Sequence, residues 1–156
     1  MMLAYYQEGF HADGRSAVLS GCLLFGSDVE PWLDAHPGVS LRAYDFEKDV
    51  GDLCFFDPCL FSDVGSAYLA GKLIVASEVF GYLSSNPGSR VCAFDPEKAM
   101  SEWFFYDAAS YDCWRDAYYL LDFVIWAEVP RWRGKHSKGD LSAFRYEPVD
   151  KISILR

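Results

Sequence analysis

The sequence lacks several features that would assign it to a common functional class. No apolar run is long enough to span a bilayer, so we expect no transmembrane segment. Glycine-rich phosphate loops and the motifs G-x-S-x-G and H-E-x-x-H are absent, so we predict no enzyme activity, no catalytic residue and no cofactor. Basic residues are scarce: 14 Lys and Arg stand against 23 Asp and Glu, a net charge of −9. Because an acidic protein repels phosphates, we expect no nucleic-acid binding.

Cysteine and histidine are too few and too irregularly placed for a metal site. The five cysteines do not recur at a regular spacing, and Cys54-x4-Cys59 has neither a partner pair nor a companion histidine, so we predict no bound metal. An odd cysteine count without a framework indicates reduced, mostly buried thiols. The start of the sequence shows no signal-peptide pattern, and together these features predict a cytoplasmic protein.

The chain does contain an internal repeat. Residues 1–50, 51–100 and 101–150 align without a gap, with 16 of 50 identities between the first two segments and 9 of 50 between the third and each of the others. A fixed period of this size indicates one supersecondary unit used three times. We therefore predict a single domain over residues 1–156, made of three repeats, with residues 151–156 at the phase of a further, closing strand.

Each repeat shows three strand patterns and one helix pattern. The strand patterns are short runs of aromatic and β-branched residues bounded by Asp, Gly and Pro. They cover residues 3–6, 23–25 and 41–44, then 53–56, 73–75 and 91–94, then 103–106, 123–125 and 141–144. Between the second and third strands, apolar residues at i, i+3 and i+4 (Val29, Trp32, Leu33) predict a helix with a buried stripe.

The limits of this helix also have sequence signals. Ser27-Asp28-Val29-Glu30 is typical of a capping box, with Ser27 as the cap and Glu30 reaching back to it. Pro37-Gly38 ends the helix, and His36 before it is predicted to cap the terminus in a left-handed conformation, as is His136. In the third repeat, Pro130 and the basic stretch after it predict a short or missing helix.

These patterns favour an α+β fold of three tandem strand-strand-helix-strand repeats with approximate pseudo-threefold symmetry. A β-trefoil, also built of three units of similar length, is the alternative. Glu47, Glu97 and Glu147 are identical in all three repeats. Related by an axis they could converge on a cation, but exposed pairing with neighbouring lysines is the simpler interpretation.

The surface carries the more informative pattern. Residues 1–100 hold 14 acidic and 6 basic side chains, whereas residues 101–156 hold 9 and 8. Acids gather around the first long helix and the strand after it, and two aromatic residues in the same region are candidate exposed anchors. The candidate partner-binding residues are Asp28, Glu30, Trp32, Asp34, Tyr44, Asp45, Glu47 and Asp49. They predict docking of a basic protein partner, with a merely solvated acidic face as the alternative.

Residues 72–83, which read Lys-Leu-Ile-Val-Ala-Ser-Glu-Val-Phe-Gly-Tyr-Leu, and the following Arg90–Pro96 resemble a pattern found in some bacterial immunity proteins. In that pattern a strand runs into a Ser-Glu helix that ends in Leu, and an aromatic strand with a Pro follows. The resemblance implies a cytoplasmic, often acidic protein that neutralises a partner toxin by binding it.

Two further functions remain open on the sequence alone. A phage-encoded inhibitor of a host defence complex has the same acidic, catalytically silent character. An enzyme or ligand-binding domain is the other alternative, with an anion site near Arg131, Arg133, Lys135 and Lys138 and with Trp132 stacking beside the ligand.

Overall fold

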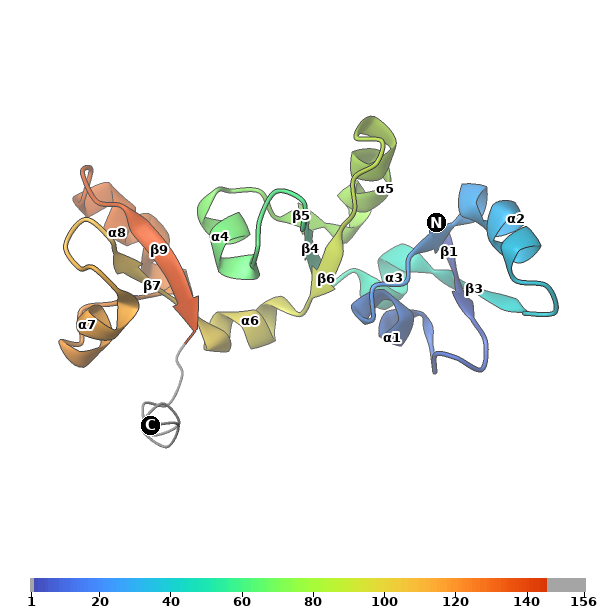
Figure 1. Cartoon of the computed structure of the whole chain (residues 1–156), viewed down its shortest axis with the longest axis horizontal. Helices are drawn as coiled ribbons and strands as arrows, with labels where there is room; N and C mark the ends of the chain where they lie inside the picture. The colour runs from blue at the N-terminus through green and yellow to red at the C-terminus, as the bar shows by residue number, and fades with distance from the viewer. Residues whose placement is uncertain (1, 146–156) are drawn as a thin grey trace. The chain divides into compact units, whose positions relative to one another are not determined.

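The computed structural model describes residues 2–145, so the predicted closing strand at 151–156 and Glu147 lie outside the described residues. The described residues form a mixture of helices and three-stranded antiparallel sheets, which confirms the α+β class (Figure 1). Within residues 2–145, none of the helices has both the length and the apolar character needed to cross a bilayer.

The three sheets share one topology, in which the first strand of each segment lies in the centre. The strand orders are β2-β1-β3, β5-β4-β6 and β8-β7-β9. The strands are β1 (Leu3–Gln7), β2 (Leu24–Phe25), β3 (Leu41–Asp45), β4 (Cys54–Phe56), β5 (Ile74–Val75), β6 (Cys92–Phe94), β7 (Trp103–Asp107), β8 (Val124–Ile125) and β9 (Leu141–Arg145). The register also recurs: Tyr5 pairs with Ala43, Phe55 with Ala93 and Phe105 with Ala143. All nine strands predicted from the sequence are present, with ends within about a residue of the prediction.

A longer helix follows the second strand of each segment, as predicted. These helices are α2 (Gly26–Ala35), α5 (Ala76–Ser85) and, in the third segment, a 3₁₀ turn η1 (Trp126–Glu128) that leads into α8 (Val129–Lys135). The third helix is the shortest, because Pro130 lies in its first turn and fixes where it begins.

The predicted start and packing of α2 are wrong in detail. The helix begins directly from β2, so Phe25 is the N-cap, and its N–H donates to Asp28 Oδ2 at 2.9 Å. Asp28 therefore takes the position expected of Glu30, and Ser27 is not the cap. No residue of α2 is fully buried, so its apolar stripe is only half-covered, whereas Val79 in α5 is fully buried.

Five short helices were not predicted. One follows the first strand of each segment, and these three helices are α1 (Gly14–Leu19), α4 (Val64–Leu69) and α7 (Trp114–Tyr119). The other two, α3 (Phe46–Val50) and α6 (Pro96–Glu102), follow the third strand. Asp13 and Asp63 cap α1 and α4, and each carboxylate accepts the N–H three residues on, at 2.8 and 2.7 Å.

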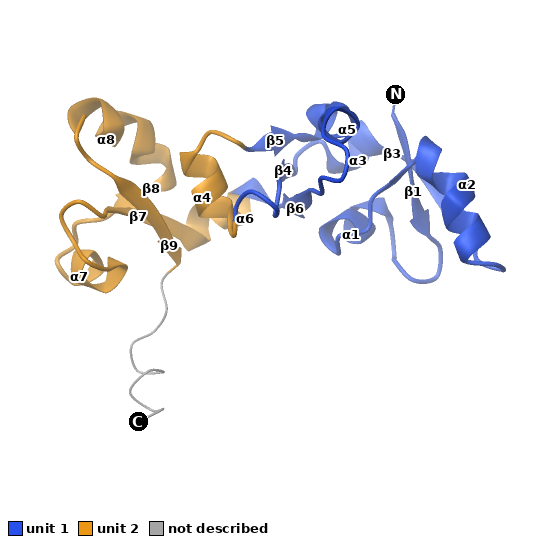
Figure 2. Cartoon of the chain, turned by 45° about the horizontal axis from the view of Figure 1, so that its top comes forward, with its two compact units in different colours: residues 1–61, 73–96 blue, residues 62–72, 97–156 orange. Residues whose placement is uncertain are grey.

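The described contacts divide the chain into two compact units (Figure 2). Unit 1 contains residues 1–61 and 73–96, and unit 2 contains residues 62–72 and 97–156. The division does not follow the repeat boundary, because α4 belongs with the third sheet rather than with the second. The prediction of one domain over the whole chain stays a prediction.

The core of unit 1 forms around α1. On one side, Ala17 of α1 is fully buried in the same cluster as Ala4, Tyr6 and Tyr44, which lie on one face of the first sheet. On the other side, α1 contacts α3 and β6, so it lies between the first and second sheets. Phe46 and Phe55 join the two sides at 6.0 Å between ring centroids. One six-residue helix thus buries apolar side chains against two sheets.

In unit 2, α4 packs on the third sheet. The helix contacts β7 and β9, and the Tyr68 ring stacks on Trp126 at 4.0 Å between centroids. Its backbone approaches the sheet so closely that a Cβ added to Gly65 would lie 2.5 Å from the Ala143 Cβ. On the opposite face of the third sheet, Trp114 of α7 stacks on Phe144. The third sheet is therefore covered by a short helix on each face.

Candidate functional site

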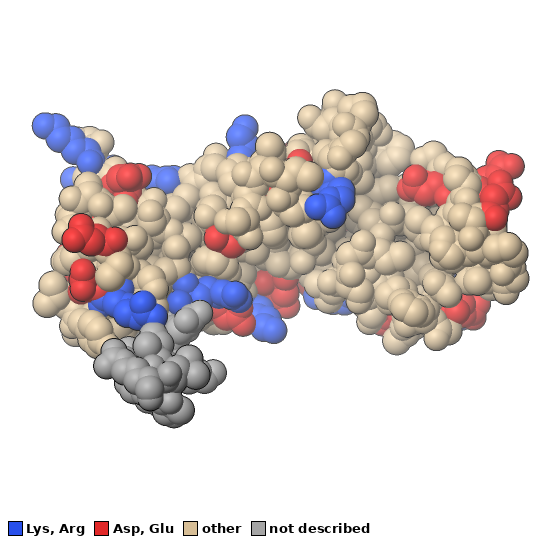
Figure 3. Space-filling model, viewed as in Figure 1, with Lys and Arg blue, Asp and Glu red and all other residues tan. Residues whose placement is uncertain are grey.

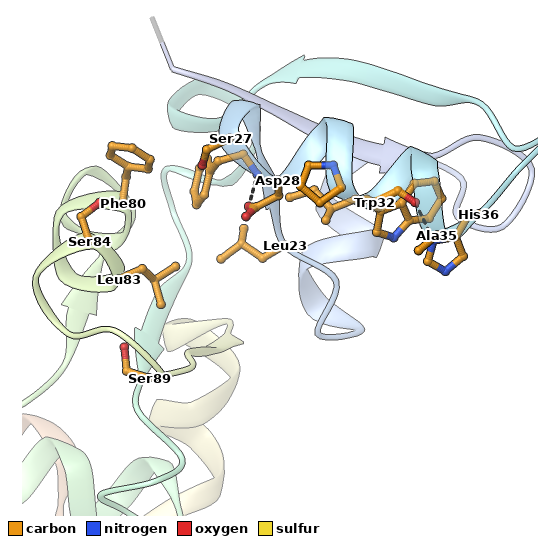
Figure 4. Close-up of a pocket in the computed structure, with 13 residues that line it drawn as sticks. Leu23, Ser27, Asp28, Trp32, Ala35, His36, Phe80, Leu83, Ser84 and Ser89 are labelled. Carbon is orange, nitrogen blue, oxygen red and sulfur yellow. Dashed lines mark hydrogen bonds between the residues drawn. The ribbon is translucent and has the colours of Figure 1, made fainter.

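A groove of about 700 Å³ lies within unit 1, between α2 and α5 (Figure 4). The β2 residues and α2 form one wall and the floor, and α5 with the turn after it forms the other wall. The lining residues are Leu23, Leu24, Phe25, Ser27, Asp28, Pro31, Trp32, Ala35, His36, Phe80, Leu83, Ser84 and Ser89. An exposed apolar concavity with a few polar groups at its edge is the usual form of a binding site.

The far end of the groove holds a stacked pair, Trp32 and His36. Their rings are 4.1 Å apart and nearly parallel, and His36 Nδ1 lies 2.8 Å from the Trp32 carbonyl oxygen. The imidazole thus satisfies a carbonyl at the end of α2, in keeping with the predicted capping role. The predicted left-handed backbone is at neither histidine, since φ is −130° at His36 and −128° at His136. In the first segment it is at Gly38, whose φ is +80°.

Asp28 gives the groove its negative charge. Its carboxylate accepts the Phe25 N–H, which fixes the side chain at the rim beside Leu23 (Figure 4). The same position favours an anion because it lies in the first turn of α2, at the positive end of the helix dipole. Asp28 is exposed and so stays available to a cation on a partner.

The other predicted acidic residues lie outside the groove. Glu30 and Asp34 are exposed on α2, and Glu47 and Asp49 are exposed on α3. Asp45 caps α3 by accepting the Lys48 N–H at 3.3 Å. On the face drawn in Figure 3, acidic side chains stand in separate groups with neutral surface between them. Of the eight candidate residues, the groove brings together two, Asp28 and Trp32.

Tyr44 was predicted as an exposed anchor, and this prediction is wrong. Its side chain is only 8% exposed, with its ring so close to Gly14 that a Cβ there would lie 2.5 Å away. Burial raises the pKa of the phenol, and its hydroxyl has no hydrogen-bond partner among the described residues. The strand alternation places Tyr44 on the face that α1 covers, so it stabilises the fold and cannot contact a partner.

The charge of the chain belongs almost entirely to unit 1. Counted over the two units, unit 1 has 12 acidic and 4 basic side chains, a net charge of −8, and unit 2 has 11 and 10, a net charge of −1. The groove therefore lies in a strongly negative unit, whose field attracts cationic partners over distances of about a Debye length, roughly 8 Å at physiological salt.

A second pocket, of about 410 Å³, lies in unit 2 and is lined by Phe123, Val124, Ile125, Glu128, Arg131, Trp132, Lys135 and His136. Each of these residues is one hundred positions after a residue of the α2 wall, and Trp132 stacks on His136 at 4.2 Å as Trp32 does on His36. The polar groups differ: Arg131 and Lys135 replace Pro31 and Ala35.

The basic stretch predicted as an anion site is only partly gathered there. Arg131 lines the pocket and lies 3.8 Å from Glu128, three residues before it, and Lys135 also lines it. Arg133 instead donates to the Leu69 carbonyl oxygen at 2.8 Å, and Lys138 does not line the pocket. Two of the four basic residues therefore face one site.

Sequence reasoning did not find the α5 wall of the groove. Phe80 and Leu83 belong to a helix fifty residues from α2, and only the fold brings the two helices together. One signal was present: the apolar residues of α5 at i, i+3 and i+4 are Val79, Tyr82 and Leu83, and Phe80 lies beside this stripe and is exposed. Asp57, a buried carboxylate that accepts a hydrogen bond from Tyr82 of α5, was also missed.

The described residues hold no group of three or more His, Cys, Asp or Glu side chains arranged for a metal ion. None of the five cysteines forms a disulfide, but the expectation that most are buried is wrong: Cys59 and Cys113 are exposed and the others half-buried. Burial raises the pKa of Cys22 and Cys54, which makes these two thiols poor nucleophiles.

Comparison with protein-family models, with curated proteins and with solved structures gives no match for this chain.

Proposed function

We propose that the protein binds a basic protein partner through unit 1 and neutralises it by covering its basic surface. The observation that carries this proposal is that the groove between α2 and α5 lies in the unit with a net charge of −8. The apolar floor would take an aliphatic or aromatic side chain, and Asp28 at the rim would pair with a neighbouring Lys or Arg. Apolar anchors supply most of the affinity in such interfaces, and charge supplies rate and selectivity.

A cytoplasmic bacterial immunity protein directed against a toxin is the class that we favour. The segment that resembles immunity proteins supplies Phe80 and Leu83 to the groove, so the resemblance and the candidate site fall on the same helix. A phage-encoded inhibitor of a host defence complex is the alternative within the same mode of action, and the identity of the bound partner separates the two.

We also propose that the three segments are copies of one unit with approximate pseudo-threefold symmetry. The common strand order, the equivalent registers and the matching pockets of the first and third segments support this arrangement. The β-trefoil has less support, because α2, α5 and α8 recur at one position of each segment and are not part of an all-strand fold.

The test is affinity capture with tagged protein from the lysate of its source, followed by a salt wash. We expect one stoichiometric basic protein that high salt releases. The variant Glu30→Lys/Asp34→Lys changes the charge by +4 at exposed positions and keeps Asp28, which caps α2, so we expect weaker capture and a smaller salt dependence.

The matched control is Asp112→Lys/Asp116→Lys, which makes the same charge change at exposed positions of unit 2. Trp32→Ala and Phe80→Ala test the groove itself. Capture that is unaffected by the α2 and groove variants, or that falls equally with the unit 2 control, would mean that this surface does not bind the partner.

A second candidate function rests on the pocket of unit 2. Arg131 and Lys135 beside the Trp132–His136 pair are suited to an anion with a planar group, such as a nucleotide. A thermal-shift screen with phosphate and nucleotides tests this function, with Arg131→Gln as the variant and Arg133→Gln, whose side chain lies away from the pocket, as the control. If no compound shifts the melting temperature, a ligand site here is excluded.

A further inference from the structure

The first sheet has one face that is less covered than the same face of the other two sheets. Leu3 lies on this face and is 42% exposed, whereas Leu53 and Trp103 at the equivalent positions are 1% and 9% exposed. Ala43 is also exposed, whereas Ala93 and Ala143 are half-buried. The opposite face of the first sheet is fully covered, with Ala4 and Tyr44 buried under α1.

The structure shows what covers this face in the other sheets. In unit 2, α4 lies on the face of Trp103 and Ala143, close enough that Gly65 admits no side chain. In unit 1, α1 contacts β6, and Arg15 at its start pairs with Asp52 just before β4 at 2.6 Å. The covering element is in both cases the first short helix of the preceding segment.

The first short helix of the third segment is α7, and the turn after it is unusually apolar. Tyr119, Leu120 and Leu121 are exposed in succession, and Leu121 is 81% exposed. The corresponding turns read Leu19-Ser20-Gly21 and Leu69-Ala70-Gly71. Gly21 and Gly71 have positive φ, and Leu121 keeps the same conformation at φ +57°, which is strained for a residue with a branched side chain. An exposed apolar side chain at a strained position is typical of a binding surface.

The packing of α1 on the second sheet, which we call the junction within unit 1, indicates what such a turn contacts. Gly21 lines a hollow of about 290 Å³ together with Pro58, Val91 and Cys92. Cys92 is the first residue of β6, and Val91 directly precedes it. Gly21 lies at the edge of this hollow, and a Cβ added there would meet no atom within 4 Å. The residues equivalent to Val91 and Cys92 in the first segment are Leu41 and Arg42, at the start of β3 beside the exposed face.

We infer that the chain associates head to tail with a second copy of itself. The turn Tyr119-Leu120-Leu121 of one copy docks on the open face of the first sheet of the other, around Leu3, Ala43 and Leu41. The contact repeats the junction that the chain already forms twice within itself. Net charge opposes this pairing less than a symmetric one, because it brings a unit of net charge −1 to one of −8, whereas a symmetric contact between two first sheets would bring together two units of −8.

The experiment measures molar mass by light scattering and sedimentation velocity, from micromolar to near-millimolar concentration. Leu3→Arg removes the receiving face. Leu120→Ser/Leu121→Gly removes the docking turn by giving it the Ser-Gly of the first segment, and it also relieves the strain at Leu121. We expect the mass of the unmodified protein to rise with concentration, and each variant alone to remain a monomer.

An equimolar mixture of the two variants is the decisive sample. Each variant keeps one intact surface, so the mixture should form a one-to-one dimer and nothing larger. The inference is wrong if the unmodified protein stays a monomer at every concentration, if either variant alone still self-associates, or if the mixture does not dimerise. A protein that self-associates only after removal of residues 151–156 would show that these residues, and not a second copy, occupy the surface.

Discussion

Asp57 is a buried carboxylate held by two donors, and it makes the stability of unit 1 depend on pH. It accepts the Tyr82 hydroxyl hydrogen and the Cys59 N–H, the latter at 2.8 Å. The bond from Tyr82, more than the other contacts, lowers the pKa of Asp57. A carboxyl whose pKa is lowered by folding contributes stability above its unfolded pKa of about 3.9, and that stability is lost as the pH falls through the lower folded value.

Replacing Tyr82 with Phe should destabilise the protein by about 1–3 kcal/mol at pH 7, because a buried charged acceptor loses its donor. Below pH 4 the difference should narrow as Asp57 becomes protonated. Urea unfolding at pH 7 and pH 3 measures both values. Tyr111→Phe is the control, since Tyr111 donates to the exposed Asp122 at 2.5 Å, and it should have a much smaller effect. Equal effects of the two substitutions would show that the burial of Asp57 is unimportant.

The same hydrogen bond raises the pKa of Tyr82 to about 12. The ordinary tyrosine pKa is about 10, so the associated stability is present below pH 10 and is lost between pH 10 and 12. Difference absorbance at the tyrosinate band during an alkaline titration should show a tyrosine that ionises about two pH units late in the native protein. If this late ionisation is missing from the Tyr82→Phe variant, the late-ionising tyrosine is Tyr82. An unchanged titration curve in that variant would contradict the assignment to Tyr82.

At the scale of elements, the sequence predicts those strands and helices whose apolar residues form a recognisable run or periodic stripe. Strands such as residues 103–107 are recognisable because aromatic residues run continuously between polar ends, and α5 because ten residues show a full apolar stripe. The short helices α1, α4 and α7 were missed because six residues do not show a helical period. Their only local signal is an aspartate three residues before a serine, at Asp13 and Asp63.

The sequence predicted one wall of the candidate site and not the other, because only one wall is formed by residues close together in the chain. Asp28 and Trp32 belong to one helix, and their i, i+4 spacing in the sequence indicates that they lie on the same side of it. The opposite wall depends on how α5 packs against unit 1, which is a property of tertiary structure. Tyr44 was misplaced because alternation along a strand tells which residues share a face, but not which of the two faces a helix covers.

The closeness of α4 to the third sheet predicts opposite effects for two glycine-to-alanine substitutions. At Gly65 the new Cβ would meet Ala143 and Trp103 at about 2.5 Å, so Gly65→Ala should destabilise the protein by about 1–3 kcal/mol. At Gly81, on the exposed side of α5, nothing lies within 4 Å, so Gly81→Ala should stabilise it by up to about 1 kcal/mol. Thermal unfolding of both variants measures the pair. A neutral Gly65→Ala would mean that α4 does not pack closely on this sheet.

At the scale of the whole molecule, the uneven charge predicts the response to salt. The exposed ion pairs Arg15–Asp52 and Arg42–Glu8 of unit 1 each contribute little, against a net charge of −8. Repulsion should dominate, so the melting temperature should rise as NaCl increases from low to physiological concentration. Glu30→Lys/Asp34→Lys should flatten that rise, whereas a fall with salt would show that the ion pairs outweigh the repulsion.

The first short helix of one segment packs on the sheet of the next segment, and this packing fixes the order of the three segments along the chain. Each junction has its own fit: Arg15 of the first segment meets Asp52 of the second, whereas Gly65 of the second leaves room for Trp103 of the third. A chain with residues 51–100 excised would keep the topology but would place an arginine where Trp103 requires a glycine. Segments of equal length and similar sequence are therefore not interchangeable, and any rearranged gene would have to evolve new junctions before its product folded as well as this one.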